Sequence, residues 1–156
     1  MADGSERQLV VFDLASEAYG VNIGTVREII RMQQITHVPE APQYVDGVIN
    51  LRGRVIPVID LRKRFGLAVT EQTENSRIVV VDSAGEDIGV IVDAVTEVLR
   101  VPGDAIEPAS SLITTEDSYY MDGIAKIGNR LLILLDLERV LQNADRELVG
   151  AAAGAA

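Results

Sequence analysis

Short apolar runs separated by turn residues recur along the whole chain. Val and Ile dominate the runs, and Gly, Asp, Asn and Ser interrupt them at spacings of about 8–12 residues, a pattern typical of all-β barrels and sandwiches. We therefore predict strands at 8–14, 18–23, 26–32, 46–50, 54–59, 77–83, 87–92, 94–101, 123–127 and 130–135. The segments 16–20 and 83–89 have the composition of hairpin turns.

Helical signal is confined to three segments: 40–47, 60–66 and 136–148. Asp60 and Asp136 stand at the start of the last two, where an aspartate oxygen can accept a hydrogen bond from the first turn as an N-cap. The segments 1–7 and 148–156 are polar or alanine-rich and are expected to be flexible termini.

The chain contains an internal repeat, found by comparing the sequence with itself. Residues 8–32 align with residues 77–101 at a constant offset of 69, and ten of the 25 positions are identical. Residues 45–65 align with 121–141 at an offset of 76, so the second copy carries seven extra residues between 101 and 121.

The repeat predicts two small five-stranded barrels within one domain spanning 8–142. The halves cover about 8–66 and 77–142, and elements can be exchanged between them. The insertion contains Pro102 and Pro108, both poor residues for an inner strand, so we expect 102–120 to leave the common barrel.

Composition excludes several classes of protein. The 14 basic and 24 acidic residues give a net charge of −10, which repels nucleic-acid backbones and anionic lipid surfaces. The chain has no cysteine, hence no disulfide framework and no thiolate metal site. Neither an apolar signal segment nor a membrane-spanning run is present, so we expect a cytoplasmic protein that needs no cofactor.

The sequence lacks a recognisable set of catalytic residues. His37 is the only histidine and is interpreted as a structural or exposed turn residue. Asp60 and Asp136 are explained by helix capping at least as well as by acid–base chemistry. The glycine-containing turns at 53 and 128 lack the lysine and hydroxyl of a phosphate-binding loop. Catalysis is therefore the weaker hypothesis.

One turn differs between the two copies. The first copy has Arg52 and Gly53 where the second has Gly128 and Asn129. Two interpretations of this change are open: neutral drift on a solvated turn, or a role that belongs to one half only. Glu28 recurs as Glu97 in the second copy, but Gly128 stands opposite Arg52, which predicts that Glu97 has no arginine partner.

The segments "AYGVNIGTVREII", "GVINLRGRVIPVIDLRKRFG", "IGVIVDAVTEVL" and "LLILLDLERVL" together resemble the CheW family, the coupling proteins of bacterial chemotaxis, over residues 8–142. The resemblance implies two SH3-like five-stranded β-barrels with a shared apolar seam and few short helices. It also implies a non-catalytic adaptor that joins the cytoplasmic tips of chemoreceptors to the regulatory domain of a histidine kinase.

The resemblance further implies a receptor groove between the barrels, to which we assign Val26, Glu28, Ile29, Arg52, Ile78 and Val98. Turns at the outer ends of the barrels, including those at Gly47 and Gly89, are candidates for binding the kinase. Val10, Val58 and Ile59 look instead like core strand positions.

Two alternatives stay open on the sequence. The chain could couple a twitching-motility or non-motility kinase pathway, or it could bind a small molecule between the barrels beside Arg52 and Glu28. We expect a monomer in isolation that forms mixed arrays with its partners, because each single interface is small.

Overall fold

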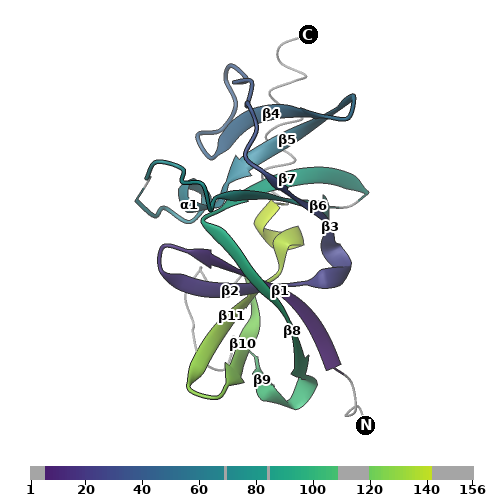
Figure 1. Ribbon diagram of the computed structural model, residues 1–156, viewed down its shortest axis with the longest axis vertical. Coiled ribbons are helices and arrows are strands. Elements are labelled where there is room, and N and C mark those ends of the chain that lie inside the picture. The colour runs from purple at the N-terminus through teal and green to yellow at the C-terminus, as the bar shows by residue number, and fades with distance from the viewer. Residues whose placement is uncertain (1–5, 69, 84, 109–119, 142–156) are drawn as a thin grey trace.

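The computed structural model describes residues 6–68, 70–83, 85–108 and 120–141 (Figure 1). The strands of these residues are β1 (Glu6–Leu14), β2 (Glu17–Asn22), β3 (Val26–Arg31), β4 (Val45–Leu51), β5 (Arg54–Asp60), β6 (Arg77–Ser83), β7 (Glu86–Val92), β8 (Ala94–Pro102), β9 (Ile106–Glu107), β10 (Met121–Ile127) and β11 (Arg130–Leu135). The helices are short: η2 (Ile23–Thr25), α1 (Leu61–Arg64), η3 (Gly103–Ala105), and a final turn over 137–141.

The strands form two sheets, and all ten predicted strands are present. Sheet A has the order β8-β1-β2-β11-β10-β9, and sheet B has the order β3-β6-β7-β5-β4. Most neighbours are antiparallel; β2 with β11 and β5 with β7 are parallel. The all-β fold with few short helices is therefore confirmed.

The two sheets do not coincide with the two sequence copies. Sheet A joins β1 and β2 of the first copy to β8, β10 and β11 of the second, whereas sheet B joins β6 and β7 of the second to β3, β4 and β5 of the first. The corresponding strands occur in the same order in both sheets. Each sheet is thus one complete repeat unit assembled from parts of both copies.

Three apolar clusters fill the molecule. One lies inside sheet B around Ile56 and Val58, and another lies inside sheet A around Leu9 and Val11. The third is the seam between the sheets, where Val10 and Ile59 are packed with many other residues. Neighbouring residues of β1 alternate between sheet interior and seam because successive side chains of a strand point to opposite faces. The predicted core positions Val10, Val58 and Ile59 are confirmed as buried.

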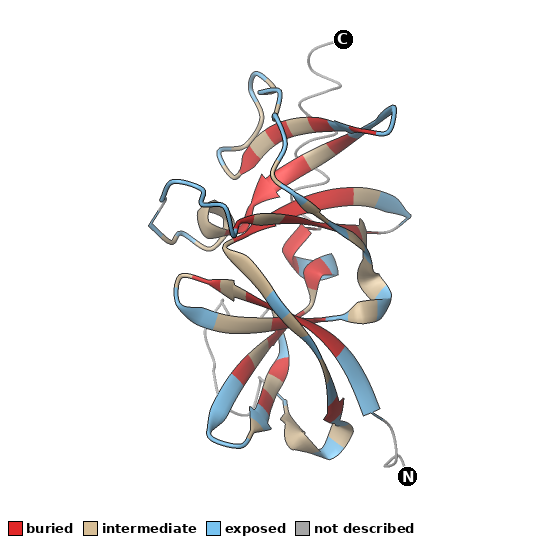
Figure 2. Cartoon of the chain, viewed as in Figure 1, coloured by how far each residue is buried: buried red, intermediate tan, exposed pale blue. Residues whose placement is uncertain are grey.

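The short helix over 137–141 lies between the two sheets, at the level of the seam (Figures 1 and 2). Its Leu137, Val140 and Leu141 are buried in the seam cluster. The residues preceding both predicted helices act as caps: Asp60 Oδ1 accepts from the N–H of Arg62 at 2.9 Å, and Asp136 Oδ1 accepts from the N–H of Arg139 at 3.3 Å.

The predicted helix over 40–47 is wrong. The segment contains turns and then enters β4 at Val45. Val45, Gly47, Ile49 and Leu51 are buried while the residues between them are not, which is the period of two that a strand requires. Pairing with β5 therefore overrides the weak helical signal of this segment.

The ends of the repeat unit also differ from the predictions. Glu6 and Arg7, expected in the flexible segment 1–7, already belong to β1 and face Pro102 and Val101 of β8. Part of the insertion does not leave the sheet, because Ile106–Glu107 pairs with β10 as the edge strand β9. The predictions for 109–119 and 148–156 fall outside the described residues.

Candidate docking surface

The hairpin between β4 and β5 turns at Arg52 and Gly53, which lie between the paired residues Leu51 and Arg54. Their φ angles are 51° and 85°, as a type I′ turn requires. The N–H of Gly53 donates to Asn50 Oδ1 at 2.8 Å, which stabilises the turn. A residue with a Cβ is disfavoured in this left-handed conformation, so glycine would fit position 52 with less strain. The turn geometry therefore does not require an arginine at position 52.

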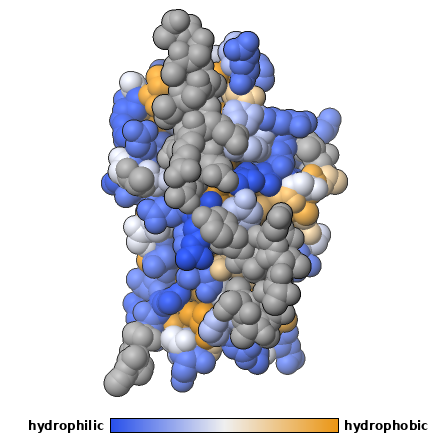
Figure 3. Space-filling view, turned by 180° about the vertical axis from the view of Figure 1, so that it is seen from behind, coloured by the Kyte–Doolittle hydropathy of each residue, from blue (hydrophilic) through white to orange (hydrophobic). Residues whose placement is uncertain are grey.

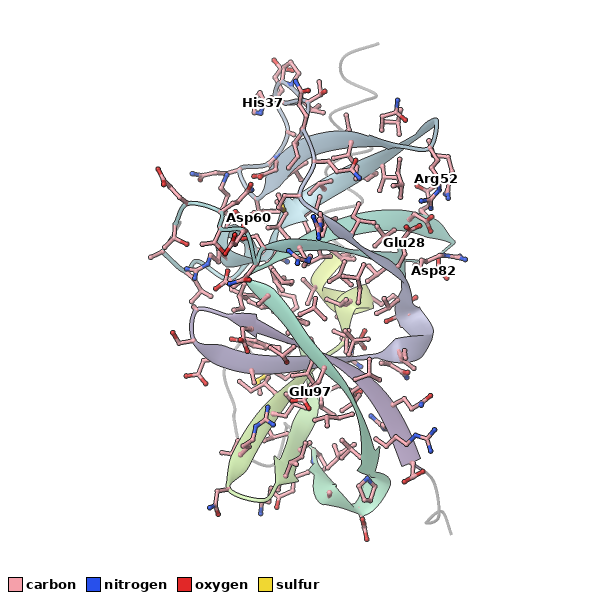
Figure 4. The ribbon with its side chains drawn as sticks, in the orientation of Figure 1. Glu28, His37, Arg52, Asp60, Asp82 and Glu97 are labelled. Carbon is pink, nitrogen blue, oxygen red and sulfur yellow. The ribbon has the colours of Figure 1, made fainter. Side chains whose placement is uncertain are left out.

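The Arg52 side chain is 69% exposed and reaches Glu28 on β3 (Figure 4). Its Nη2 donates a hydrogen bond to Oε2 of Glu28, whose side chain is 32% exposed. This hydrogen bond raises the pKa of Arg52 above its ordinary value. The pair holds a permanently charged, solvent-facing guanidinium in one orientation, which suits recognition of a partner.

A second ion-pair group lies at the same end of sheet B. Arg27 Nε is 2.9 Å from Asp87 Oδ1, and Arg54 Nη2 is 2.8 Å from Asp87 Oδ2. The Asp87 side chain is only 8% exposed, because the two arginines cover both of its oxygens. Arg27 also lies 3.6 Å from Asp82. The β4–β5 hairpin is therefore connected to β3 and β7 by charged groups that already have partners within the chain.

Four large apolar side chains of the described residues are exposed: Ile29, Val55, Val98 and Leu131. They form two pairs related by the repeat, Ile29 with Val98 and Val55 with Leu131. Ile29 and Val98 were predicted docking residues; Val55 and Leu131 were missed. The alternation of β5 could have found Val55, because Ile56 and Val58 point inward and their odd-numbered neighbour must then point outward.

The structure brings together some of the predicted receptor residues and separates others. Glu28 and Arg52 are in contact, and Ile29 follows Glu28 on the edge strand β3. Val98 lies on β8, the edge strand of the other sheet. Val26 is half-buried and packs against the seam. Ile78 is fully buried, because its side chain packs with Ile56 and Val58 in the cluster inside sheet B, so a surface position for Ile78 is wrong.

The predicted position of Gly47 and Gly89 on outer turns is wrong, because both are buried within strands, β4 and β7. Gly47 is buried in β4 with φ 149°, and a Cβ there would lie 2.0 Å from the carbonyl oxygen of Thr36. Gly89 is buried in β7, where a Cβ would lie 2.8 Å from Cγ2 of Ile78. Close packing of the chain explains both glycines.

The repeat counterpart of Gly47 has the same packing. A Cβ at Gly123 would lie 2.8 Å from the carbonyl oxygen of Glu107, and a strand irregularity precedes the glycine in both copies. The pairs Thr36–Val48 and Glu107–Ile124 are likewise equivalent. The glycine that recurs in the repeat therefore allows a crossing segment to approach the strand closely.

Glu97 has an arginine partner, contrary to prediction. Its Oε2 lies 3.2 Å from Nη1 of Arg130, the residue that corresponds to Arg54 in the first copy. The prediction considered only Gly128, the counterpart of Arg52. Arg130, two positions after Gly128 in the hairpin, reaches Glu97 instead.

Other features of the described residues give little support to a ligand-binding or enzymatic role. Within 6–68, 70–83, 85–108 and 120–141 no group of acidic, histidine or cysteine side chains is arranged to hold a metal ion. An aromatic hollow of about 180 Å³ is lined by Tyr19, Phe65 and Tyr120 among others. Its volume is below the roughly 300–1,000 Å³ of typical ligand pockets. Larger hollows of about 470 Å³ at Arg77 and about 350 Å³ at Gly24 are lined mainly by polar residues, whereas ligand pockets are mostly apolar. His37 is exposed on a loop (Figure 4).

The described residues visible on the face shown in Figure 3 are largely hydrophilic, with apolar side chains in small separate groups. Among the helices of the described segments, none has the length and apolar character needed to span a bilayer.

Residues 8–145 match the CheW-like domain family. The chain is 34% identical to the chemotaxis protein CheW of Klebsiella aerogenes over 92% of this chain and 86% of that protein. It is 37% identical to the CheW of Bacillus subtilis over 86% of each. The crystal structure of the scaffolding protein TtCheW from Thermoanaerobacter tengcongensis superposes with a TM-score of 0.82 and 41% identity, covering 88% of this chain and 94% of that one. The sequence repeat, the two sheets and these relatives agree that the chain belongs to the CheW family of non-catalytic chemotaxis adaptor proteins.

Proposed function

We propose that this chain couples the cytoplasmic tips of chemoreceptors to the regulatory domain of a histidine kinase, working beside the membrane in receptor arrays. The observation that carries the proposal is Arg52. Its backbone has a conformation that favours glycine, its side chain is exposed, and Glu28 holds its guanidinium in place. These properties favour a docking group over a residue that stabilises the fold.

The receptor-docking surface is proposed to comprise Glu28, Ile29 and Arg52, with Val55 beside the hairpin turn and Val98 on the edge strand β8 of the other sheet. Ile29 and Val55 supply apolar contact area, since 39% and 72% of their surfaces are exposed. Arg52 supplies a planar group that can bind a carboxylate of the partner. An acidic or amide-rich, partly apolar receptor segment fits this combination.

Binding of the purified chain to a chemoreceptor tip fragment tests the proposal. We expect saturable binding that weakens when Arg52 is replaced, together with receptor-dependent activation of the kinase. Failure to bind the tip fragment and the kinase regulatory domain at high micromolar concentration would contradict an adaptor role.

Sedimentation tests the expected assembly behaviour. Alone and dilute, the chain should sediment as a monomer, whereas a mixture with the kinase regulatory domain should contain larger species. A small interface gives weak individual contacts, so the larger species should depend on the concentration of both proteins. A stable dimer of the isolated chain would contradict this expectation.

A further inference from the structure

The chain crosses between the two sheets at two places that are equivalent in the repeat. It passes from β2 of sheet A to β3 of sheet B through η2, whose central residue is Gly24. It returns from β7 of sheet B to β8 of sheet A through the single residue Asp93, the counterpart of Gly24. The two crossings therefore have the same topology but different side chains.

The crossing at Asp93 is closed by a network of directional bonds. Arg62, the second residue of α1, donates from Nε to Asp93 Oδ1 at 2.9 Å and from Nη2 to Oδ2 at 2.6 Å. Asp93 Oδ2 also accepts from the N–H of Ala15, in the β1–β2 turn of sheet A, at 2.9 Å. The N–H of Asp93 donates to the carbonyl oxygen of Asp13 at 3.0 Å. Arg62 and Asp93 thus connect α1, which follows β5 of sheet B, to sheet A.

This network is well placed to be strong. The Arg62 side chain is 16% exposed and that of Asp93 is 33% exposed, so solvent screens the pair less than it screens most surface pairs. A two-bond contact between a guanidinium and a carboxylate also fixes the relative orientation of the two groups. The hydrogen bond from Arg62 lowers the pKa of Asp93 below its ordinary value, so the carboxylate stays charged.

Among the described residues, the crossing at Gly24 shows no side-chain pair equivalent to Arg62 and Asp93. Glycine has no side chain to accept hydrogen bonds, and the counterpart of Arg62 is the exposed Glu138. The N–H of Gly24 donates a local hydrogen bond to Asn22 Oδ1 at 3.1 Å. A hollow of about 350 Å³ lies here, lined in part by Gly24 and Glu138, whereas the hollow at Arg62 and Asp93 measures about 20 Å³.

We propose that Arg62 and Asp93 form a one-sided clamp that sets how the two sheets are placed on each other, and that the Gly24 side is where this placement can change. The apolar seam holds the sheets together, but apolar contacts are not directional. The hydrogen bonds of the clamp are directional and therefore fix the orientation of one sheet relative to the other. Arg62 is in this sense a positioning residue, since it touches none of the proposed docking residues.

The consequence for docking rests on the proposed function. Strand β3, which carries Glu28 and Ile29, begins directly after the Gly24 crossing, and β8, which carries Val98, begins directly after Asp93. The clamp therefore controls the spacing between the two edge strands that carry these groups. A partner that contacts both strands would bind best to one placement of the sheets, and loss of the clamp would weaken it.

The test measures the distance between the sheets in the free protein. The chain has no native cysteine, so Val55→Cys on β5 and Leu131→Cys on β11 give one spin label on each sheet. Double electron–electron resonance should then show a broader distribution of the distance between the two labels in Arg62→Gln and in Asp93→Asn than in the parent. The double variant should be no broader than either single variant, because the two residues act as one pair.

The converse test, a transplant of the arginine–aspartate pair, adds a clamp to the crossing that lacks one. Gly24→Asp with Glu138→Arg copies the pair to the open crossing at the equivalent positions, and it should narrow the distribution. Arg130→Gln is the matched control, because it removes an exposed arginine pair that lies within sheet A alone. Its distribution should equal that of the parent.

Each result decides the proposal. If Arg62→Gln retains its far-UV circular dichroism and its distribution matches that of Arg130→Gln, the clamp is refuted. If Arg62→Gln does not fold, the transplant decides: a narrower distribution supports the clamp, and an unchanged one refutes it. Affinity for a receptor tip fragment should also fall about fivefold or more in Arg62→Gln. If the parent binds no tip fragment but the distances change as stated, the clamp stands and the proposed function fails.

Discussion

Sheet A and sheet B are built from equivalent strands, yet the glutamate that both carry has a different partner in each. In sheet B, Glu28 binds Arg52, which lies in the hairpin turn itself. In sheet A, Glu97 binds Arg130, which follows the turn. Arg130 corresponds to Arg54, so the first copy has both arginines within reach and uses the one in the strained position.

Two sequence differences accompany this difference in pairing. Asp87 pairs with Arg54 as well as with Arg27, and its equivalent in sheet A is Ala18, which has no carboxylate. The counterpart of Arg52 is Gly128, which has no side chain, so Arg130 is the hairpin arginine that pairs with Glu97. We expect that without Asp87 the side chain of Arg54 would be free to pair with Glu28.

The largest expected effect compares the two glycines at the centres of the sheets. A Cβ at Gly89 would lie 2.8 Å from Cγ2 of Ile78 and 3.2 Å from Cγ2 of Val58, both β-branched and stiff. A Cβ at Gly20 would meet only the ends of Leu132 and Leu134, at 3.2 Å. Gly89→Ala should therefore destabilise the fold by roughly 1–3 kcal/mol, and Gly20→Ala by less. Urea unfolding measures both, and equal costs would show that the two interiors are equally tight.

The next effect concerns Arg52. Arg52→Gly should leave the melting temperature unchanged or slightly raised, because glycine relaxes the left-handed turn. Receptor-dependent kinase activation should fall roughly tenfold or more, as expected when an interface arginine anchor is lost. Arg52→Ala should lose activation similarly but without the relaxation of the turn.

Arg130→Ala is the matched control for Arg52, since it removes the corresponding glutamate pair of sheet A. It should retain receptor-dependent kinase activation.

Charge reversal tests the pair itself. If Glu28→Arg with Arg52→Glu recovers more activity than either single change, then the mutual orientation of the pair matters. Unfolding of Arg52→Gly, or intact coupling in it, would show that the arginine turn is not a docking device.

A smaller effect should follow from making sheet B resemble sheet A. Asp87→Ala frees Arg54, which can then bind Glu28 as Arg130 binds Glu97. The loss of stability should be about 1 kcal/mol or less, because the arginine partners are exposed. Replacing Arg52 should then reduce activation by a smaller factor than it does in the parent. A double-mutant cycle on receptor binding measures this, and strict additivity would contradict the expectation for Asp87.

The smallest effect is a dependence on pH at the cap of α1. Burial raises the pKa of Asp60 above its ordinary value, and the nearby Asp46 adds to this. The folded state therefore holds that proton more tightly than the unfolded state, and the contribution of Asp60 to stability falls as pH rises from the ordinary carboxyl pKa through the raised one. Asp60→Asn keeps an oxygen to cap Arg62 and removes this titration.

Thermal melts across the acidic range test the cap. Relative to the parent, Asp60→Asn should gain stability as pH rises and show the smallest difference at the acidic end. Asp136→Asn is the matched replacement at the corresponding cap of the other copy. A difference between Asp60→Asn and the parent that grows as pH falls would reverse the sign and refute the interpretation.

Local patterns in the sequence were enough to find the strands and the caps. Each strand identifies itself by composition and by its turn residues, and Asp60 and Asp136 act on N–H groups only two or three residues away. The helical signal of 40–47 failed because a strand partner in β5 outweighed it. Short-range preference decides an element only where no long-range pairing competes.

The candidate site was predicted less completely. Arg52 and Glu28 were assigned through the resemblance to the CheW family, whereas the repeat showed only that the turn at Arg52 differs between the copies. Ile78 was misplaced because β6 is apolar on both faces, and its pattern does not tell an inward position from an outward one. Glu97 was left without a partner because its arginine lies two residues beyond the aligned position.

The sequence by itself determined the repeat, the order of strands in each copy, the buried positions Val10, Val58 and Ile59, and the family. Only the tertiary structure decided that the copies exchange strands, that Arg54 pairs with Asp87 while Arg52 pairs with Glu28, and that Arg62 binds Asp93 at one crossing between the sheets. The physical reason is the separation along the chain over which each effect acts. Alternation and capping act over a few residues along the chain, whereas strand exchange and ion pairs depend on distances across space between residues far apart in sequence.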